Sequence, residues 1–176
     1  MTSTIEFHRS PSAGFDEPFE MLAACHERVE RMLALLEKLE AHVAQHGSDA
    51  AAAQAARDVM RYFDQAGPAH HEDEERHVFP PLLQDPAVAD AVRRLQAEHG
   101  QMEAQWPGVR ADLVALEGGS GALPPGAAAR WSTYAALYRR HILLEDGVVY
   151  PAARQRLDDA TQAAMGEEMA RRRGVR

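Results

Sequence analysis

The sequence predicts an all-α fold, an antiparallel up-down-up-down four-helix bundle with a short C-terminal tail helix. Alanine, leucine, glutamate and arginine dominate the chain, and these residues favour helix. No segment alternates apolar and polar residues as a half-buried strand does. Glycine and proline clusters divide the chain into long periodic segments with short connections, which is the pattern of a bundle.

Each helix follows from its apolar spacing and from the residues that interrupt it. In chain order the predicted helices span residues 17–45, 50–83, 84–117 and 126–157, with a tail helix after 158. Gly47 ends the first, and Ser48 or Asp49 caps the second. Gly67-Pro68 should kink the second helix, and the segment 106–108 should bend the third.

Length and composition limit the possible functions. We expect one domain over residues 1–176, with the bundle core at about 17–158. No stretch resembles a membrane span or a signal peptide, so we expect a cytoplasmic protein without membrane contact. The net charge of −8 argues against a nucleic-acid partner. Cys25 is the only cysteine, which excludes an intrachain disulfide and a thiolate zinc site.

The stretch HHEDEERHVFPP, residues 70–81, concentrates histidines and acids on the second helix. Such a run is either a solvated charged face or a metal site. Two registers give a histidine and an acid four residues apart, namely His70 with Glu74 and His71 with Glu75. The run alone does not choose between them.

A second copy in the fourth helix selects the register. HILLEDGVVYP, residues 141–151, aligns with the first run on the aromatic-proline pair that ends both. His70 then matches His141 and Glu74 matches Glu145, each 71 residues apart. The other histidine of the first run has an isoleucine as its counterpart. The shared pattern therefore selects His70 and Glu74.

The spacing brings an imidazole and a carboxylate together. Residues four apart lie about 40° apart around a helix and one turn along it, so their side chains are neighbours. A single pair is usually an ordinary surface contact. Two pairs at matched positions on helices that can face each other favour a metal site, which bundle cores hold in this way.

The first and third helices each add one inward histidine. His26 lies on the apolar stripe between Leu22 and Val29, and His99 lies one turn after Leu95. A lone histidine on such a face is more often a core residue than a ligand. Four buried histidines without a shared purpose would be costly, however, and convergence on metal explains them together.

These residues resemble those of the hemerythrin-like HHE cation-binding domain family. The matching stretches are, in order, CHERV, HHEDEERHVFPPL, EH and HILLEDGVVYP, which cover about residues 18–157. The resemblance implies an antiparallel four-helix bundle around a non-haem di-iron centre. It also implies a ligand set in which two glutamates bridge the irons, composed of His26, His70, Glu74, His99, His141 and Glu145.

One departure from the family concerns the third helix. The oxygen carriers have a second histidine one turn before the position of His99, where this chain has Leu95. Glu103, one turn after His99, is an alternative ligand, although its position fits an exposed glutamate better. His71 is another candidate neighbour of the ligands. The fourth-helix carboxylate also lies four residues after its histidine, where the carriers have an aspartate at five. A more open iron favours reactivity or sensing over reversible transport.

Three classes of function fit this site. The first is a module with two non-haem iron ions that binds or senses dioxygen, nitric oxide or peroxide, acting through a protein partner. The second is an enzyme that reduces peroxide or nitric oxide, or supplies iron to damaged centres. The third is an iron-handling or metal-free interaction bundle. Imidazole and carboxylate ligands also suit manganese or zinc. Tyr138 is a candidate hydrogen-bond donor to a bound ligand, whereas Tyr134 is expected in the core and Cys25 has no assigned role.

Overall fold

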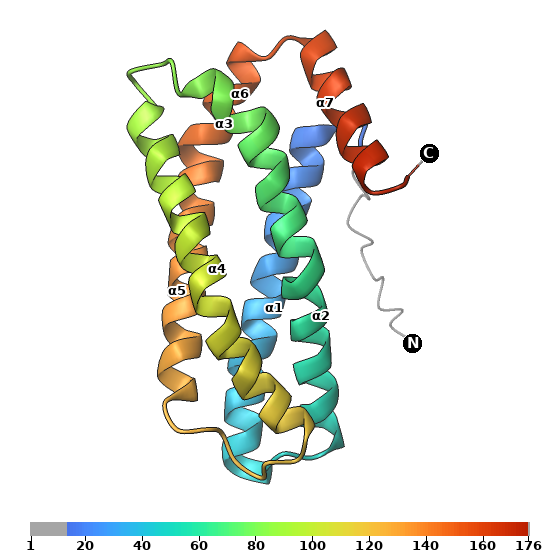
Figure 1. Cartoon of the computed structure of the whole chain (residues 1–176), viewed down its shortest axis with the longest axis vertical. Helices are drawn as coiled ribbons and strands as arrows, with labels where there is room; N and C mark the ends of the chain where they lie inside the picture. The colour runs from blue at the N-terminus through green and yellow to red at the C-terminus, as the bar shows by residue number, and fades with distance from the viewer. Residues whose placement is uncertain (1–13, 176) are drawn as a thin grey trace, which may run out of the picture.

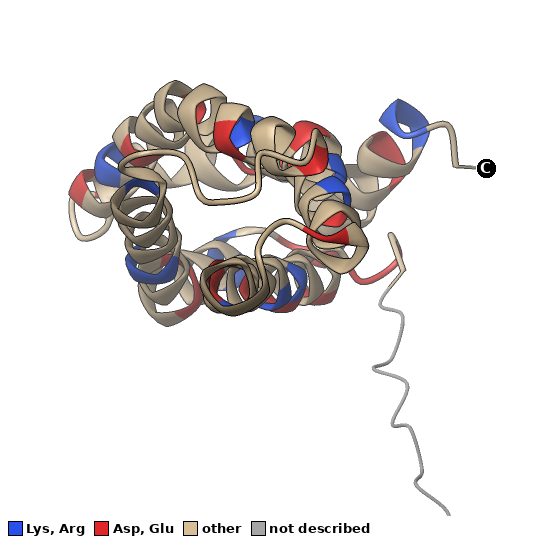
Figure 2. Ribbon diagram, turned by 90° about the horizontal axis from the view of Figure 1, so that it is seen from below, with Lys and Arg blue, Asp and Glu red and all other residues tan. Residues whose placement is uncertain are grey.

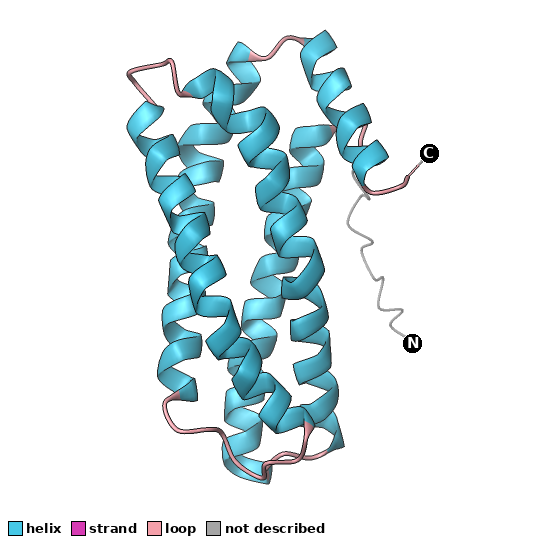
Figure 3. Ribbon diagram, in the orientation of Figure 1, coloured by secondary structure: helices cyan, strands magenta, loops and turns pink. Residues whose placement is uncertain are grey.

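The structure is a computed structural model that describes residues 14–175. These residues are helical apart from short connections, and no strand occurs among them (Figure 3), so the predicted all-helical class is confirmed. No helix within this range is long and apolar enough to cross a membrane. The helices are α1 (Pro18–His46), α2 (Ala50–Asp73), η1 (Glu74–Val78), α3 (Phe79–Leu82), α4 (Ala89–Glu117), α5 (Ala127–Leu144), η2 (Glu145–Val149), α6 (Tyr150–Arg156) and α7 (Asp159–Arg172).

The four long helices lie side by side along the long axis of the molecule (Figure 1). The chain runs down α1, up α2, down α4 and up α5 in this view. Helix α2 packs against α1 and α4, and α5 packs against α4 and α1, so the four close around a shared interior. Acidic and basic residues are both distributed around the outside of the bundle (Figure 2).

The connection between α1 and α2 settles which residue caps α2. The Asp49 side chain accepts a hydrogen bond from the Ala52 backbone N–H at 2.8 Å, which satisfies one free donor of the first turn. The Ser48 hydroxyl donates instead to the Leu116 carbonyl at the end of α4, at 2.5 Å. Gly47 has a φ of 75°, a conformation that favours glycine. Asp49 is therefore the cap, and Ser48 ties the connection to α4.

Two π-helical segments interrupt the predicted second and fourth helices. The expectation of regular α-helix over 50–83 and 126–157 is wrong at η1 and η2. Phe79 N–H donates to the Glu74 carbonyl and Tyr150 N–H to the Glu145 carbonyl, five residues back. A proline follows each aromatic residue and has no N–H to continue the α pattern. The wider turn accommodates it, and π-bulges of this kind occur often at functional sites. Pro68 and Pro107, in contrast, lie within continuous helix.

The apolar core is divided into two clusters by a polar layer. The lower cluster includes Phe63, Trp131 and Tyr134, and the upper cluster includes Phe79 and Leu95. Helices α1 and α4 pass from one cluster to the other, whereas α2 and α5 reach the upper cluster through their continuations, η1 with α3 and η2 with α6. Each long helix carries a buried histidine at the crossing. The polar layer is therefore enclosed by apolar packing at both ends.

Helix α7 packs beside the upper end of α1, outside the four long helices (Figure 1). Met165 and Met169 are buried in the upper cluster. Arg172 and Arg173 form ion pairs with the fully buried Asp73 at 2.6 and 2.5 Å. These contacts hold the tail helix against the end of α2, directly before Glu74.

The packing of α7 depends on a close backbone approach at Gly166. A Cβ atom at this position would overlap the carbonyl oxygen of Phe15. We expect Gly166→Ala to lower the free energy of unfolding by about 1–3 kcal/mol, because either the helix or the segment at Phe15 must move. Gly100→Ala is the control, since an added Cβ meets nothing there within 4 Å, and it should stabilise the protein by about 0.5–1 kcal/mol. Urea unfolding measures both, and equal effects of the two variants would contradict the packing at Gly166.

Candidate metal centre

The polar layer brings together all of the side chains predicted as metal ligands. Each long helix contributes a histidine, and Glu74 and Glu145 are the first residues of η1 and η2. Every one of these side chains is buried. The histidines are His26 on α1, His70 on α2, His99 on α4 and His141 on α5.

The histidines form two pairs whose ring nitrogens face each other. Nε2 of His26 lies 3.0 Å from Nε2 of His70. Nε2 of His99 lies 3.2 Å from Nε2 of His141. We call these the His26/His70 pair and the His99/His141 pair. In each pair, two ring nitrogens from different helices therefore lie close together.

The two glutamates lie between the pairs, and each presents one oxygen to each pair. Glu74 Oε1 lies 3.5 Å from His70 Nε2, and its Oε2 lies 3.4 Å from His99 Nε2. Glu145 Oε2 lies 3.1 Å from His26 Nε2, and its Oε1 lies 2.9 Å from His141 Nε2. Two groups that can hold a metal ion result, one at each histidine pair, and they share both glutamates.

Three outer carboxylates determine which ring nitrogens carry hydrogen. Nδ1 of His26 donates to Asp146 at 2.9 Å, and Nδ1 of His99 donates to Glu75 at 2.9 Å. Nδ1 of His141 donates to Glu98 at 3.1 Å. In the neutral imidazole the other nitrogen, Nε2, then presents a lone pair to the interior. That is the form in which histidine binds a metal.

Four buried atoms of the polar layer are left without hydrogen bonds. Glu74 Oε2, both oxygens of Glu145 and His70 Nδ1 are buried and have no hydrogen-bond partner within the described residues. The Glu145 oxygens lie close to imidazole nitrogens, but no hydrogen bond of good geometry joins them. Buried carboxylates facing nitrogen lone pairs require a cation among them. The donor set therefore fits metal ions of the imidazole and carboxylate class.

Burial and neighbouring side chains shift the pKa values of the acids and histidines in the polar layer. Burial alone would raise the pKa of Glu145, but contacts with His141 and His26 hold it well below its usual value. Burial alone would lower the pKa of His26, but its hydrogen bond to Asp146 and its close contact with Glu145 raise it to about 10. Without a metal, a proton on His26 thus serves as a cation for the glutamates. A metal ion that binds there must displace that proton.

The 71-residue repeat extends to residues that the sequence did not single out as site residues. Glu75 and Asp146 occupy matching positions, and each orients a histidine of a neighbouring helix. Phe79 and Tyr150 also match, and they stack on His99 and His26 at centroid distances of 5.5 and 5.3 Å. The repeated acid and the repeated aromatic-proline pair were the sequence signals that could have identified these residues. Glu98 carried a weaker one, its position directly before His99.

The two copies of the repeat differ at the hydroxyl of Tyr150, which Phe79 lacks. It donates a hydrogen bond to Glu74 Oε1 and lies 3.2 Å from Nε2 of His26. Burial and the nearby charges of Glu74 and Glu145 raise the pKa of Tyr150 well above its usual value, so the phenol keeps its proton. Phe79 offers no such donor in the other half. The His26/His70 pair is thus covered by a hydroxyl, and the His99/His141 pair is not.

His71 lies beside the centre but in a different orientation from the ligand candidates. One of its ring nitrogens is within 4.8 Å of ligand nitrogens of His99 and His141. Its ring stacks on that of His99 with centroids 3.9 Å apart and planes at 15°. His71, His99 and His141 form a third group that could hold a metal ion. The in-plane lone pairs of two nearly parallel rings do not converge on one ion, so we expect His71 to lie beside the ions and not to bind them. Burial and the neighbouring His99 lower its pKa well below its usual value.

The other candidates are placed outside the metal groups. Glu103 is exposed and belongs to none of the groups found in residues 14–175, as expected of a surface glutamate. Leu95 is fully buried in the upper apolar cluster. Tyr134 is in the lower cluster, and Tyr138 lies there too, with its ring 6.0 Å from that of His71. Cys25 is only partly buried.

The remaining histidines lie away from the centre. His42 bonds to Asp49 at the far end of α1, and its ring lies near that of His46. His77 pairs with Glu168 of α7 at 2.6 Å. His8 lies outside the described residues. None of the described three contributes to the metal groups.

Comparison with known proteins agrees with the geometry. The family model of the hemerythrin HHE cation binding domain matches residues 17–153. An uncharacterized protein of Haemophilus influenzae (strain ATCC 51907 / DSM 11121 / KW20 / Rd) is 30% identical over 165 residues, which cover 93% of this chain and 94% of the relative. The matched region contains every residue of the polar layer. The chain therefore belongs to the hemerythrin HHE cation-binding domain family.

Proposed function

We propose that this protein holds two non-haem iron ions and binds or senses a small ligand, dioxygen, nitric oxide or peroxide, at an open iron position. The observation that carries the proposal is the pair of glutamates, each of which presents one oxygen to each histidine pair. The proposed ligands are His26 and His70 for one ion, His99 and His141 for the other, and Glu74 and Glu145 as bridges. The proposed scaffold is the antiparallel up-down-up-down bundle whose helix course is visible in Figure 1.

The ions would supply a centre that exchanges electrons with a small ligand. Side chains of the protein orient the ligands, exclude water and hold a proton near the centre. Asp146, Glu75 and Glu98 orient three imidazoles through their Nδ1 hydrogens. The apolar clusters above and below the layer exclude water. Tyr150 holds its proton at the Glu74 oxygen, on one side of the centre only.

One experiment separates this proposal from its main alternative, an enzyme that reduces peroxide or nitric oxide. The metal content and optical spectrum of the purified protein are measured before and after anaerobic reduction, and again after dioxygen or peroxide is added. Two iron ions per chain and a stoichiometric spectral change support binding or sensing. Repeated consumption of peroxide supports the enzyme. A protein that retains no metal contradicts both.

The register of the site is tested by paired substitutions. We expect His70→Ala and Glu74→Ala to remove most of the bound metal, because each deletes a proposed ligand. His71→Ala should have a far smaller effect, since its ring does not point at the ions. Glu75→Ala should weaken metal affinity by about 10–100-fold, as loss of an orienting partner does, while leaving metal bound at saturation. Metal analysis after dialysis measures all four. Equal losses from His70→Ala and His71→Ala would show that the register is wrong.

We also predict that the protein is not primarily a reversible oxygen carrier. Leu95 fills the position from which the carriers supply an additional imidazole, so one ion has a more open shell. The reduced protein should oxidise rapidly in air, and it should react with peroxide or nitric oxide. Leu95→His should slow that oxidation in a stopped-flow experiment, with Leu95→Met as a control for repacking. Repeated oxygenation cycles of the wild-type protein without loss of its optical signal would overturn this prediction.

The Tyr150 hydroxyl is expected to stabilise the metal-free protein more than the metal-loaded one. Tyr150→Phe leaves a buried Glu74 oxygen without its donor, which should lower the free energy of unfolding of the metal-free form by about 1–3 kcal/mol. Bound ions would satisfy that oxygen, so the loss should shrink on loading. Tyr62→Phe is the control, because Tyr62 donates to a backbone carbonyl, that of Cys25, at 3.2 Å, and neither residue belongs to a metal group found in residues 14–175. Its effect should be the same in both forms, as measured by urea unfolding.

A further inference from the structure

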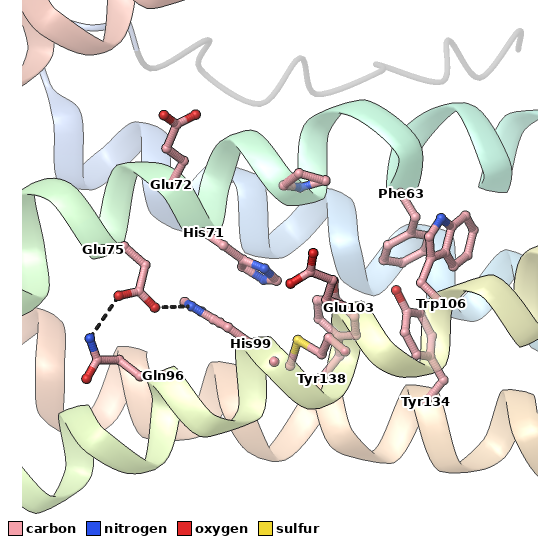
Figure 4. Close-up of a pocket in the computed structure, with 13 residues that line it drawn as sticks. Phe63, His71, Glu72, Glu75, Gln96, His99, Glu103, Trp106, Tyr134 and Tyr138 are labelled. Atoms are coloured by element: carbon pink, nitrogen blue, oxygen red, sulfur yellow. Dashed lines mark hydrogen bonds and ion pairs between the residues drawn. The ribbon is translucent and has the colours of Figure 1, made fainter.

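A cavity between α2 and α4 reaches the centre from one side only. It has a volume of about 520 Å³, and both His71 and His99 line it. Figure 4 shows His71 projecting into it from α2 and His99 from α4, with Phe63, Trp106 and Tyr134 at one end and Glu75 and Gln96 at the other. His99 is the one proposed ligand in its lining, from which His26, His70 and His141 are absent.

The two halves of the centre differ in how they are covered. Both pairs are buried, His26 and His70 at 4% and 3% exposed and His99 and His141 at 7% and 2%, so the difference lies in what covers them. The buried Tyr150 hydroxyl lies against the His26/His70 pair. The His99/His141 pair is covered by His71, whose ring is only partly buried and makes no hydrogen bond among the described residues. A small molecule in the cavity therefore meets a free imidazole first, and then the nitrogens of His99 and His141 within 4.8 Å of it.

The negative charge of the cavity lining favours neutral small molecules over anions. The carboxylates of Glu72, Glu75 and Glu103 line the cavity, and no lysine or arginine does. Arg76 and Arg172 pair with Glu72 from outside, so Glu75 and Glu103 contribute most of the negative field. A cleft of one sign repels anions of the same sign. Neutral molecules pass, and the aromatic end offers them apolar surface.

We propose that neutral small ligands, the class of dioxygen, nitric oxide and hydrogen peroxide, reach the centre through this cavity at the His99/His141 half, and that His71 donates a hydrogen bond to the ligand bound there. This inference rests on the proposed function, because it requires a metal at that half. It adds the route, the receiving half and the donor. His71 is a positioning residue and not a ligand of the metal.

Gly100 gives a way to close the cavity without touching the centre. It lines the cavity, and an added Cβ has nothing within 4 Å. Nitric oxide association with the reduced, iron-loaded full chain is followed by stopped-flow absorbance. Gly100→Phe should slow association about tenfold at unchanged iron content. Ala97→Phe, on the exposed face of the same helix, is the control and should stay within about twofold of wild type. Wild-type rates in Gly100→Phe with intact iron would overturn the route.

A second measurement does not depend on iron chemistry. Dissolved dioxygen is paramagnetic and speeds the nuclear relaxation of protons that it approaches. In the full chain loaded with Zn²⁺, the ring protons of His71 and His99 should relax faster under dioxygen than those of His26, and Gly100→Phe should remove the difference. Stronger relaxation at His26 would place the access route on the other half. Failure of the histidine resonances to respond to Zn²⁺ would instead contradict the proposed metal centre, so the two failures are distinguishable.

The role of His71 is tested by replacing its nitrogen while retaining its shape. His71→Phe keeps a flat ring over His99 but has no donor, so nitric oxide should dissociate about tenfold faster with little change in association. His71→Gln restores a donor and should recover part of the loss. Azide, an anion, should gain more in association rate from Glu103→Gln than nitric oxide does. An unchanged rate of nitric oxide dissociation in His71→Phe would overturn the assignment of His71 as the donor. Equal gains in association rate for azide and nitric oxide in Glu103→Gln would overturn the assigned ligand class.

Discussion

Two buried glutamates that face the lone pairs of four imidazoles are the constraint on which the rest of this structure depends. Such a group is costly in an apolar interior unless a cation neutralises it and hydrogen bonds fix its outer atoms. The bundle meets the second condition at three of the four histidines, through Asp146, Glu75 and Glu98, and leaves His70 Nδ1 without a partner among the described residues. The first condition is what makes the layer a metal centre. The apolar clusters above and below provide the stability that a polar mid-layer does not.

The π-helical segments follow from the same constraint. Glu74 and Glu145 each begin one, and each segment is followed by an aromatic residue and a proline. A wide turn changes the direction of every side chain after it relative to a regular helix. The glutamate that begins each segment points inward at the layer, and the wide turn after it places the aromatic residue five positions later against a histidine of another helix. The aromatic-proline pair is thus part of how the site is built, in addition to marking the repeat.

Much of this was predictable from sequence because it is encoded locally. Helix existence follows from composition and apolar spacing, and the matched histidine and glutamate pairs follow from a repeat that needs no tertiary information. The partners of the outer nitrogens were not predictable. Asp146 orients a histidine 120 residues earlier in the chain, and the Tyr150 hydroxyl reaches Glu74 across the bundle. These contacts depend on how helices face one another, which spacing within one helix does not specify. The choice between Ser48 and Asp49 as a cap likewise required the position of α4.

The repeat makes the halves of the centre equivalent in their ligands and leaves them different in their surroundings. Each half has two histidines and a share of both glutamates, so these side chains alone would give two bound ions no reason to behave differently. The differences lie in the side chains that surround the histidines and glutamates. A phenol covers one half, where the matching phenylalanine leaves the other without a donor. A second histidine, opposite an isoleucine in the repeat, stands between the other half and the cavity. Differing surroundings give like groups different reactivity, so under the proposed function the departures from the repeat, more than the repeat itself, would determine where a ligand binds and reacts.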